Sequence, residues 1–448
     1  MPYVLPTDAL VWLLVAVATG YAFYCRRHAH LSVPWRRVFQ SPAAMASTVV
    51  LAAFLAVGLL DSLHFRPALP QKDGESKAYA SEVLSVLDLG LSHLRGRSEK
   101  TYSAPLATRS YAKELVELPD GKQMRDFPRL RFGGAHLKDE AERAGDVAKR
   151  TLGGLAVSIF LVFLTLVAAK KLRVKTPDIP WTAAGAALGA LLLLAGPAIA
   201  LSTAYNVLGT DKVGQDVFYL ALKSIRTSLV IGLVTTLVLL PLGIVLGTMA
   251  GYFRGWVDDG IQYFYTTLNS IPGVLLIAAS VLMMQVYLDR HPDWFSIAAQ
   301  RADIKLLVLC AILGLTSWTG LARLLRGETL KLSQLEYIQA AHAFGVRDAR
   351  ILARHILPNV SHIVIIAMVM DFSGLVLAEA VLSYVGVGVD PSTNSFGTMI
   401  NAARLEMSRE PVVWWALATA FCFMFALVLA ANLFADAARD GFDPRVRV

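Results

Sequence analysis

Nine long runs of apolar residues divide this chain. They cover about 8–25, 43–61, 151–169, 182–203, 227–250, 272–288, 305–323, 360–379 and 412–434. Each run, if helical, is long enough to cross about 30 Å of hydrocarbon. Hydrophobic residues make up 55% of the 448 residues and charged residues only 17%, which is unlike a soluble domain. We therefore expect an all-α polytopic membrane protein with about nine transmembrane helices.

Basic residues gather between alternate apolar runs, and such clusters mark the loops that stay in the cytoplasm. They are Arg26, Arg27, Arg36 and Arg37, then Lys170, Lys171, Arg173 and Lys175, then Arg323, Arg326, Lys331, Arg347, Arg350 and Arg354. Alternation puts the N-terminus outside and the C-terminal Arg439, Arg445 and Arg447 in the cytoplasm. The net charge of +8 therefore reflects topology, and no nucleic acid partner is expected.

The same alternation predicts four parts. Residues 1–61 hold two N-terminal transmembrane helices, and 62–150 form an external, periplasmic soluble insert, α+β or mainly helical, with dense charges of both signs. Residues 151–181 add one more transmembrane helix and a cytoplasmic loop. Residues 182–448 form the remaining transmembrane core. A loop of this core, 326–359, is strongly charged although it lies between two apolar runs.

The pattern of this loop predicts a helical hairpin that faces water and a partner protein. Tyr337, Ala340, Ala341 and Phe344 recur at i, i+3, i+4 and i+7, so they share one helix face. Gly345 can take the left-handed conformation that ends a helix. We expect Pro358 to stop the second helix before the next span. The polar side chains left for contacts across the joint include Glu336, Arg350, Arg354 and His355.

The layout E-Y-x-x-A-A-x-A-x-G at 336–345, followed by R-x-x-x-x-H-x-L-P-N at 350–359, resembles the cytoplasmic coupling loop of ABC importer permeases. Five other motifs of the chain resemble those of the dipeptide, oligopeptide and nickel importer family and occur in the same order as in that family. They are LGTDKVGQD at 208–216, AGYFRGWVDD at 250–259, EAVLSYVGVGVDP at 379–391, SFGTMI at 395–400 and NLFADAARDGFDPR at 432–445. Gln215 stands where that family usually has arginine. The resemblance covers about 182–448 and is strongest to the C-type inner-membrane permease; the first three spans and the insert lie outside it.

The resemblance implies an assembly. In that family the loop docks into an ATPase subunit, and a second homologous permease, two ABC ATPase subunits and an external solute-binding protein complete the transporter in the bacterial inner membrane. The solute would be a peptide or a similar small molecule. No G-x-x-x-x-G-K-[ST] string occurs in the chain, so ATP and Mg²⁺ are expected in the ATPase subunits and no catalytic residue here.

Two carboxylates enter the apolar run at 360–379, where charges are costly and usually face a polar path or a partner helix. Asp371 and Glu379 are therefore candidates for the translocation pathway. No carboxylate or third imidazole shares a helix face with His355 and His362, so no metal site is expected there. Two other functions stay open on the residues alone. One is an ion-coupled secondary transporter, and the other is a membrane-anchored sensor that uses the insert.

Overall fold

The computed structural model describes residues 1–69, 79–117, 123–176, 178–295 and 297–442, so Arg445 and Arg447 lie outside the described residues. The chain forms two compact units. The first unit comprises Met1–Val4, Phe39–Ser228 and Pro391–Ala430. The second unit comprises Leu5–Val38, Leu229–Asp390 and Ala431–Val448.

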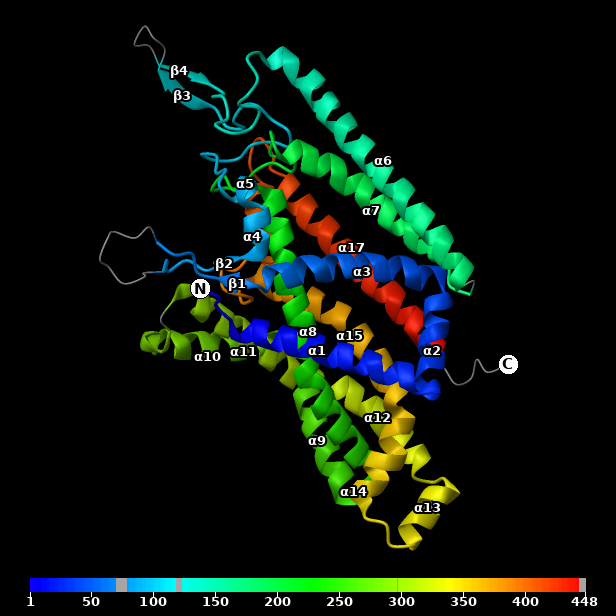
Figure 1. The fold of residues 1–448 in the computed structure, drawn as a ribbon. Coiled ribbons are helices and arrows are strands. Elements are labelled where there is room, and N and C mark those ends of the chain that lie inside the picture. Colours follow the sequence, from blue (N-terminus) through cyan, green and yellow to red (C-terminus); the bar gives the residue numbers. More distant parts are fainter. Residues whose placement is uncertain (70–78, 118–122, 177, 296, 443–448) are drawn as a thin grey trace, which may run out of the picture. The chain divides into compact units, whose positions relative to one another are not determined.

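Within the described ranges, eight helical segments are long and apolar enough to cross a membrane. They are α1 (Pro6–Arg27), α3 (Pro42–Asp61), α6 (Arg143–Lys175), α7 (Trp181–Ser202), α8 (Val217–Phe253), α11 with α12 (Ala298–Ser317 and Thr319–Leu332), α15 (Leu357–Val385) and α17 (Trp415–Phe442). A ninth span arises if α9 (Gly255–Ser270) and α10 (Gly273–Asp289), which meet at 86°, count as one. The expected all-α polytopic fold is confirmed (Figure 1).

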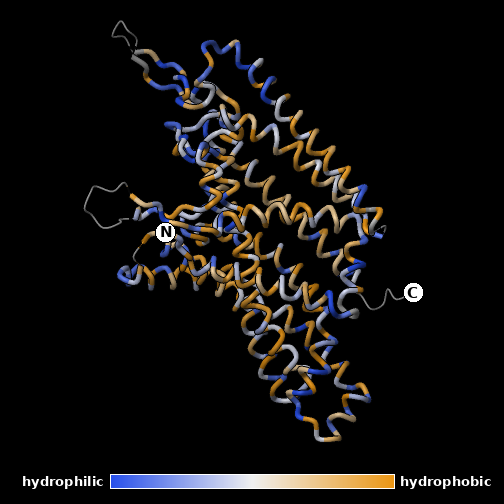
Figure 2. The backbone as a smooth tube through the Cα atoms, viewed as in Figure 1, coloured by the Kyte–Doolittle hydropathy of each residue, from blue (hydrophilic) through white to orange (hydrophobic). Residues whose placement is uncertain are grey.

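The spans differ from the apolar runs mainly at their ends. α6 continues eight residues before the run at 151–169, through the polar residues from Arg143, and Figure 2 shows it hydrophobic along its middle and hydrophilic at both ends. The run at 272–288 covers only α10, the second helix of the bent pair. A short helix, α2 (Ala29–Gln40), connects α1 to α3.

In the first unit, α6 and α7 approach each other closely because both carry small residues at the contact. A Cβ added at Gly154 would lie 2.7 Å from the Gly196 carbonyl oxygen, so no side chain fits there. The Ser158 hydroxyl crosses the same interface and donates to the Leu192 carbonyl at 2.7 Å.

The insert between α3 and α6 contains both helices and strands. β1 (His64–Phe65) pairs antiparallel with β2 (Leu84–Ser85), and β3 (Glu114–Glu117) pairs antiparallel with β4 (Gln123–Asp126). α4 (Val86–Gly90), α5 (Ser92–Arg95) and a short 3₁₀ turn, η1 (Glu140–Glu142), complete its described elements.

The insert is bonded to the turn that precedes α8, the LGTDKVGQD string. Thr210 donates its amide to the Ser103 carbonyl at 3.0 Å and accepts from the Ser103 amide at 2.7 Å. Glu99 donates its amide to the Gly214 carbonyl at 2.9 Å. Gly214 has φ +78°, and a Cβ there would lie 1.9 Å from the Glu99 carbonyl oxygen. This glycine of the string is therefore needed for both its backbone conformation and its contact with the insert.

A buried ion network makes a second connection between the insert and α8. Lys223 of α8 donates to Asp61, at the end of α3, at 2.6 Å and to Asp88 of α4 at 3.1 Å. The Ser85 hydroxyl donates to Asp61 at 2.6 Å, and the Tyr219 hydroxyl donates to Asp88 at 2.7 Å. Both carboxylates are nearly inaccessible, with side chains 3% and 5% exposed. One ammonium thus holds two buried carboxylates in place.

In the second unit, a ridge of three glycines on α8 packs against α12. A Cβ at Gly243, Gly247 or Gly251 would lie within 2.8 Å of an atom of α12, in two cases a backbone carbonyl oxygen. Such contact between backbones is typical of small residues four apart in membrane helices. α12 also holds α9, because the Nε and Nη2 atoms of Arg326 each donate to one oxygen of the Asp258 carboxylate at 2.6 Å.

Our expectation for Pro358 was wrong. The helix does not stop there but runs from α14 (Asp348–Ile351) through a π-helical turn, η3 (Leu352–Ile356), into α15. Pro358 occupies the first turn of α15, where a missing amide N–H costs little. The wide π turn before it absorbs the irregularity without ending the helix.

Candidate functional site

The charged loop between α12 and α15 folds as a hairpin of short helices. α13 (Glu336–Ala343) ends at Phe344, and Gly345 follows with φ +75°. The Val346 amide donates to the Ala341 carbonyl at 3.1 Å and the Gly345 amide to the His342 carbonyl at 2.9 Å. These two bonds and the left-handed glycine form a Schellman motif, which satisfies the last carbonyls of the helix. The expected role of Gly345 is thus seen in the backbone.

Three isoleucines anchor the hairpin in the core of the second unit. Ile338 is 2% exposed, and Ile351 and Ile356 are fully buried. They belong to one cluster with Leu239 of α8, residues of α12 and Val360 of α15. In Figure 1 α13 lies beyond the end of α12, whereas α14 lies level with the lower end of α9. The hairpin therefore projects from the helices but is tied firmly to them.

The opposite side of the hairpin is exposed and carries most of the expected contact residues. Tyr337 and Phe344, at the two ends of α13, are aromatic residues with exposed fractions of 47% and 86%. The other exposed members of the expected set are Glu336, Ala340, Gly345, Arg350 and Arg354. His355 is half-buried, with its ring 6.1 Å from that of Tyr337. Aromatic side chains this exposed on a short, anchored helix are typical of a protein contact site.

Ala341 does not lie on this exposed side, which corrects the face that its spacing suggested. It is half-buried and packs against the cluster around Ile338. The reason is geometric: Ala341 is three residues after Ile338, the one fully buried residue of α13, so both point toward the core.

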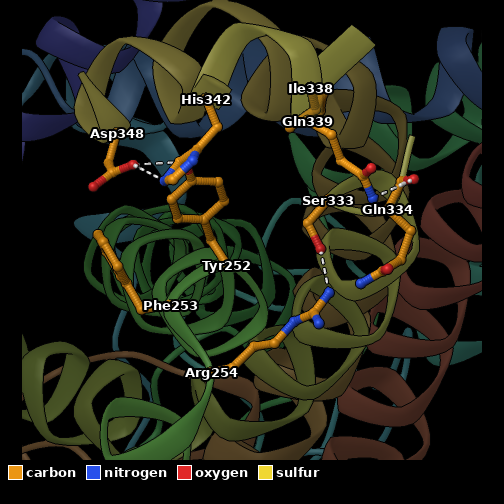
Figure 3. A pocket seen from close by; sticks show the side chains of 9 residues that line it. All are labelled: Tyr252, Phe253, Arg254, Ser333, Gln334, Ile338, Gln339, His342 and Asp348. Carbon is orange, nitrogen blue, oxygen red and sulfur yellow. Dashed lines mark hydrogen bonds and ion pairs between the residues drawn. The ribbon is translucent and has the colours of Figure 1, made fainter. Parts of the chain in front are cut away.

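Behind the hairpin lies a polar pocket of about 460 Å³, shown in Figure 3. Its lining comes from the end of α8, the α12–α13 connection, α13 and α14, and comprises Tyr252, Phe253, Arg254, Ser333, Gln334, Ile338, Gln339, His342 and Asp348. The Tyr252 hydroxyl donates to Asp348 at 2.7 Å, and the His342 ring lies 3.9 Å from the same carboxylate oxygen. Arg254 donates to the Ser333 hydroxyl at 2.9 Å.

Arg254 has an unusual backbone. Its φ of 54° and ψ of −167° fall in a region that essentially only glycine adopts, at a cost of order 1–3 kcal/mol. We did not single out Arg254 or Tyr252 from the sequence. The only signal was an arginine next to Gly255 in AGYFRGWVDD, where one helix ends and another begins.

The two carboxylates of α15 occupy different surroundings. Glu379 is 1% exposed and accepts a hydrogen bond from Ser383, one turn later, at 2.6 Å. Asp371 is half-buried, two turns before Glu379 on the same helix. Neither residue is part of the hairpin or of the polar pocket.

Comparison with known proteins identifies the chain. A family model described as the binding-protein-dependent transport system inner membrane component matches residues 243–448. The glutathione transport system permease protein GsiD of Pectobacterium atrosepticum is 35% identical over 242 residues, 54% of this chain and 73% of that protein. The chain belongs to this permease family. The oligopeptide transport system permease protein OppC of Haemophilus influenzae is 26% identical over 318 residues, 71% of this chain and 92% of that protein.

Among solved structures, the inward-facing MetNI methionine ABC transporter covers 50% of this chain and 97% of its own, with a TM-score of 0.38 and 16% identity.

The resemblance drawn from the motifs is therefore confirmed. The protein is a multi-pass inner-membrane permease subunit of an ABC transporter, and this function is favoured over a secondary transporter or a membrane-anchored sensor. Since the family is binding-protein-dependent, the permease is one component of a larger transport system. The matched family region, 243–448, contains the hairpin and the polar pocket, whereas the insert precedes it.

Proposed function

We propose that this permease forms half of the translocation pathway of an ATP-driven importer and is driven through the α12–α15 hairpin, which docks on an ABC ATPase subunit. One observation carries the proposal. α13 presents two exposed aromatic side chains, Tyr337 and Phe344, on a helix whose other side is fixed in the core by Ile338. A rigid apolar knob of this kind can transmit the movement of a partner to α12 and α15.

The complete transporter would contain a second homologous permease, two ABC ATPase subunits that bind ATP and Mg²⁺, and an external solute-binding protein. The orientation that fits is the one predicted from the basic clusters, with the N-terminus outside, the insert in the periplasm, and the hairpin and C-terminus in the cytoplasm. The named relatives transport glutathione, oligopeptides and dipeptides. A peptide or a similar small solute is therefore the proposed cargo, with Asp371 and Glu379 as candidate pathway residues.

The test is a single substitution at the most exposed aromatic residue. Burying a phenylalanine side chain contributes about 1.5–3 kcal/mol. Phe344→Ala should therefore weaken ATPase binding on the order of tenfold to a hundredfold, because each 1.4 kcal/mol is tenfold in Kd. The permease itself should be synthesised and inserted into the membrane normally, since Phe344 is 86% exposed and contributes little to the packing of the fold.

Phe160→Ala is the matched control, because Phe160 of α6 is also strongly exposed, at 61%, but belongs to a span outside the family region. Affinity purification of the permease, followed by quantification of the bound ATPase, gives the answer. If Phe344→Ala retained as much ATPase as Phe160→Ala and the wild type, the hairpin would not be the docking element.

A further inference from the structure

The corner between α8 and α9 contacts both ends of the hairpin. α8 ends at Phe253 and α9 begins at Gly255, so Arg254 alone separates the two helices. On one side of this residue Tyr252 reaches Asp348, and Arg254 itself reaches Ser333. In Figure 3 the two contacts lie on opposite sides of the polar pocket.

The arginine contact holds the start of the hairpin. Ser333 follows the last residue of α12, and its hydroxyl also donates to the Leu330 carbonyl at 2.9 Å, so it accepts from Arg254 in a fixed orientation. The Gln334 side-chain amide also faces the guanidinium, and with its oxygen turned toward Arg254 it would accept from both terminal nitrogens. A planar guanidinium is suited to such forked donation. Arg254 thus fixes the connection from α12 to α13.

The tyrosine contact holds the far end. Asp348 is the first residue of α14, and its carboxylate accepts from the Tyr252 hydroxyl at 2.7 Å. The Tyr252 ring packs against the same apolar cluster that holds Ile338 and Ile351. The hydroxyl therefore extends from a ring that is held on one side by the core of the hairpin. Polar groups attached to packed side chains hold their partners with little freedom.

We infer that Tyr252 and Arg254 are positioning residues that clamp the coupling hairpin to α8 and α9, so that its movement reaches these helices directly as well as through α12 and α15. The strained backbone of Arg254 supports this function, because such conformations persist where the surrounding contacts fix them and gather at functional sites. A glycine would suit that backbone better but would make none of the contacts. The clamp rests on the proposed docking of the hairpin for its part in transport.

The strained position allows a test that separates positioning from stability. Arg254→Gly removes the guanidinium and relieves the backbone strain, so the thermal unfolding midpoint should equal or exceed that of the wild type. Tyr252→Phe removes only the hydroxyl that reaches Asp348. Tyr263→Phe is the control, since Tyr263 of α9 is 77% exposed and its hydroxyl makes none of the hydrogen bonds found among the described residues.

Hairpin mobility can be measured in the assembled transporter by double electron–electron resonance, which gives the distribution of distances between two spin labels. Spin labels at the exposed positions Ala349 and Thr267, in α14 and α9, would be placed in a background without the native cysteines. The wild type and Tyr263→Phe should give one narrow distance distribution. Arg254→Gly and Tyr252→Phe should broaden it and lower ATP hydrolysis per bound ATPase subunit, with unfolding midpoints at or above the wild-type value for Arg254→Gly.

Two results would overturn the inference. Distributions as narrow as the wild type in both variants would show that the corner does not hold the hairpin, whatever Phe344→Ala does to ATPase binding. Broad distributions with unchanged hydrolysis per bound ATPase would show that the contacts have no part in coupling. Failure of the docking proposal looks different, since ATPase would then remain bound to Phe344→Ala while the distances in the clamp variants could still change.

Discussion

Replacing Lys223 by methionine should be among the most damaging single changes in the first unit. Methionine keeps most of the side-chain volume but removes the ammonium that holds Asp61 at 2.6 Å and Asp88 at 3.1 Å. Removing one partner of a buried ion pair costs about 3–5 kcal/mol, because the remaining charge is left uncompensated. The hydroxyls of Ser85 and Tyr219 still donate to the two carboxylates, which places the expected loss near the lower end, at about 3 kcal/mol.

The assay is thermal unfolding of the purified permease in lipid nanodiscs, and the readout of unfolding is proteolysis of the insert. Lys100→Met serves as the matched control, since Lys100 pairs with Glu114 but its side chain is 81% exposed. Pairs of that kind contribute about 0–1 kcal/mol. Asp61→Asn in the Lys223→Met background should restore part of the loss, because it removes one of the two uncompensated charges.

Acid should act on the same network. Burial by itself would raise the pKa of the Asp88 carboxyl, but the Lys223 ammonium and hydrogen bonds from the Ser85 amide and Tyr219 hydroxyl outweigh it and hold that pKa below the ordinary 3.8. The stability that Asp88 contributes is therefore present above pH 3.8 and lost as the pH falls below it.

The substitutions can also refute the reasoning. If Lys223→Met unfolded at no lower temperature than Lys100→Met, or if Asp61→Asn lowered its unfolding temperature further, the buried pairs would not be what fastens the insert to α8.

Three further predictions concern other parts of the permease. Burial raises the pKa of Asp216, before α8, to about 6, so stability should fall as the pH rises from 3.8 to about 6, and Asp216→Asn should flatten this dependence in unfolding scans; an unchanged slope would refute it. Gly345→Ala should destabilise the hairpin by about 1–2 kcal/mol through its left-handed backbone alone, since no atom lies within 4 Å of the added Cβ. Faster amide exchange in α13 is the readout, and exchange at the wild-type rate would contradict it. A cysteine at Leu115 in the insert should react with an impermeant thiol reagent in intact spheroplasts, and one at Ala349 only after lysis; the reverse pattern would reverse the proposed topology.

Much of the fold could be predicted because the bilayer constrains it simply. Hydrophobic length predicts the spans, and these runs matched the structure apart from their ends. The ends differ because a helix continues into water wherever its residues allow it. Thus α6 begins at Arg143, in a polar segment that hydropathy cannot include. The bend between α9 and α10 was missed because polar residues of α9, such as Asp258 and Asp259, kept it out of the apolar run, although α9 and α10 together are apolar enough for one span.

The site was predictable only where its geometry is local. Gly345 ends α13 through contacts within five residues, and the sequence predicts such a cap. Ala341 was placed on the wrong side because its spacing to Tyr337 and to Ile338 fits two different faces, and only packing decides between them. The contacts of Arg254 and Lys223 join residues about 80 to 160 positions apart, which no periodicity reports.

The glycine ridge of α8 limits how the second unit can bend. At Gly247 and Gly251 the backbone of α8 meets the backbone of α12, and at Gly243 it meets the Leu321 side chain. The two helices therefore cannot tilt against each other without a collision, so they behave mechanically as one stiff beam. Arg326 and Asp258 attach α9 to that beam. A pivot then has to lie beyond it, and the 86° break after Ser270, where Ile271 and Pro272 separate α9 from α10, is a place where the chain can bend without breaking a helix.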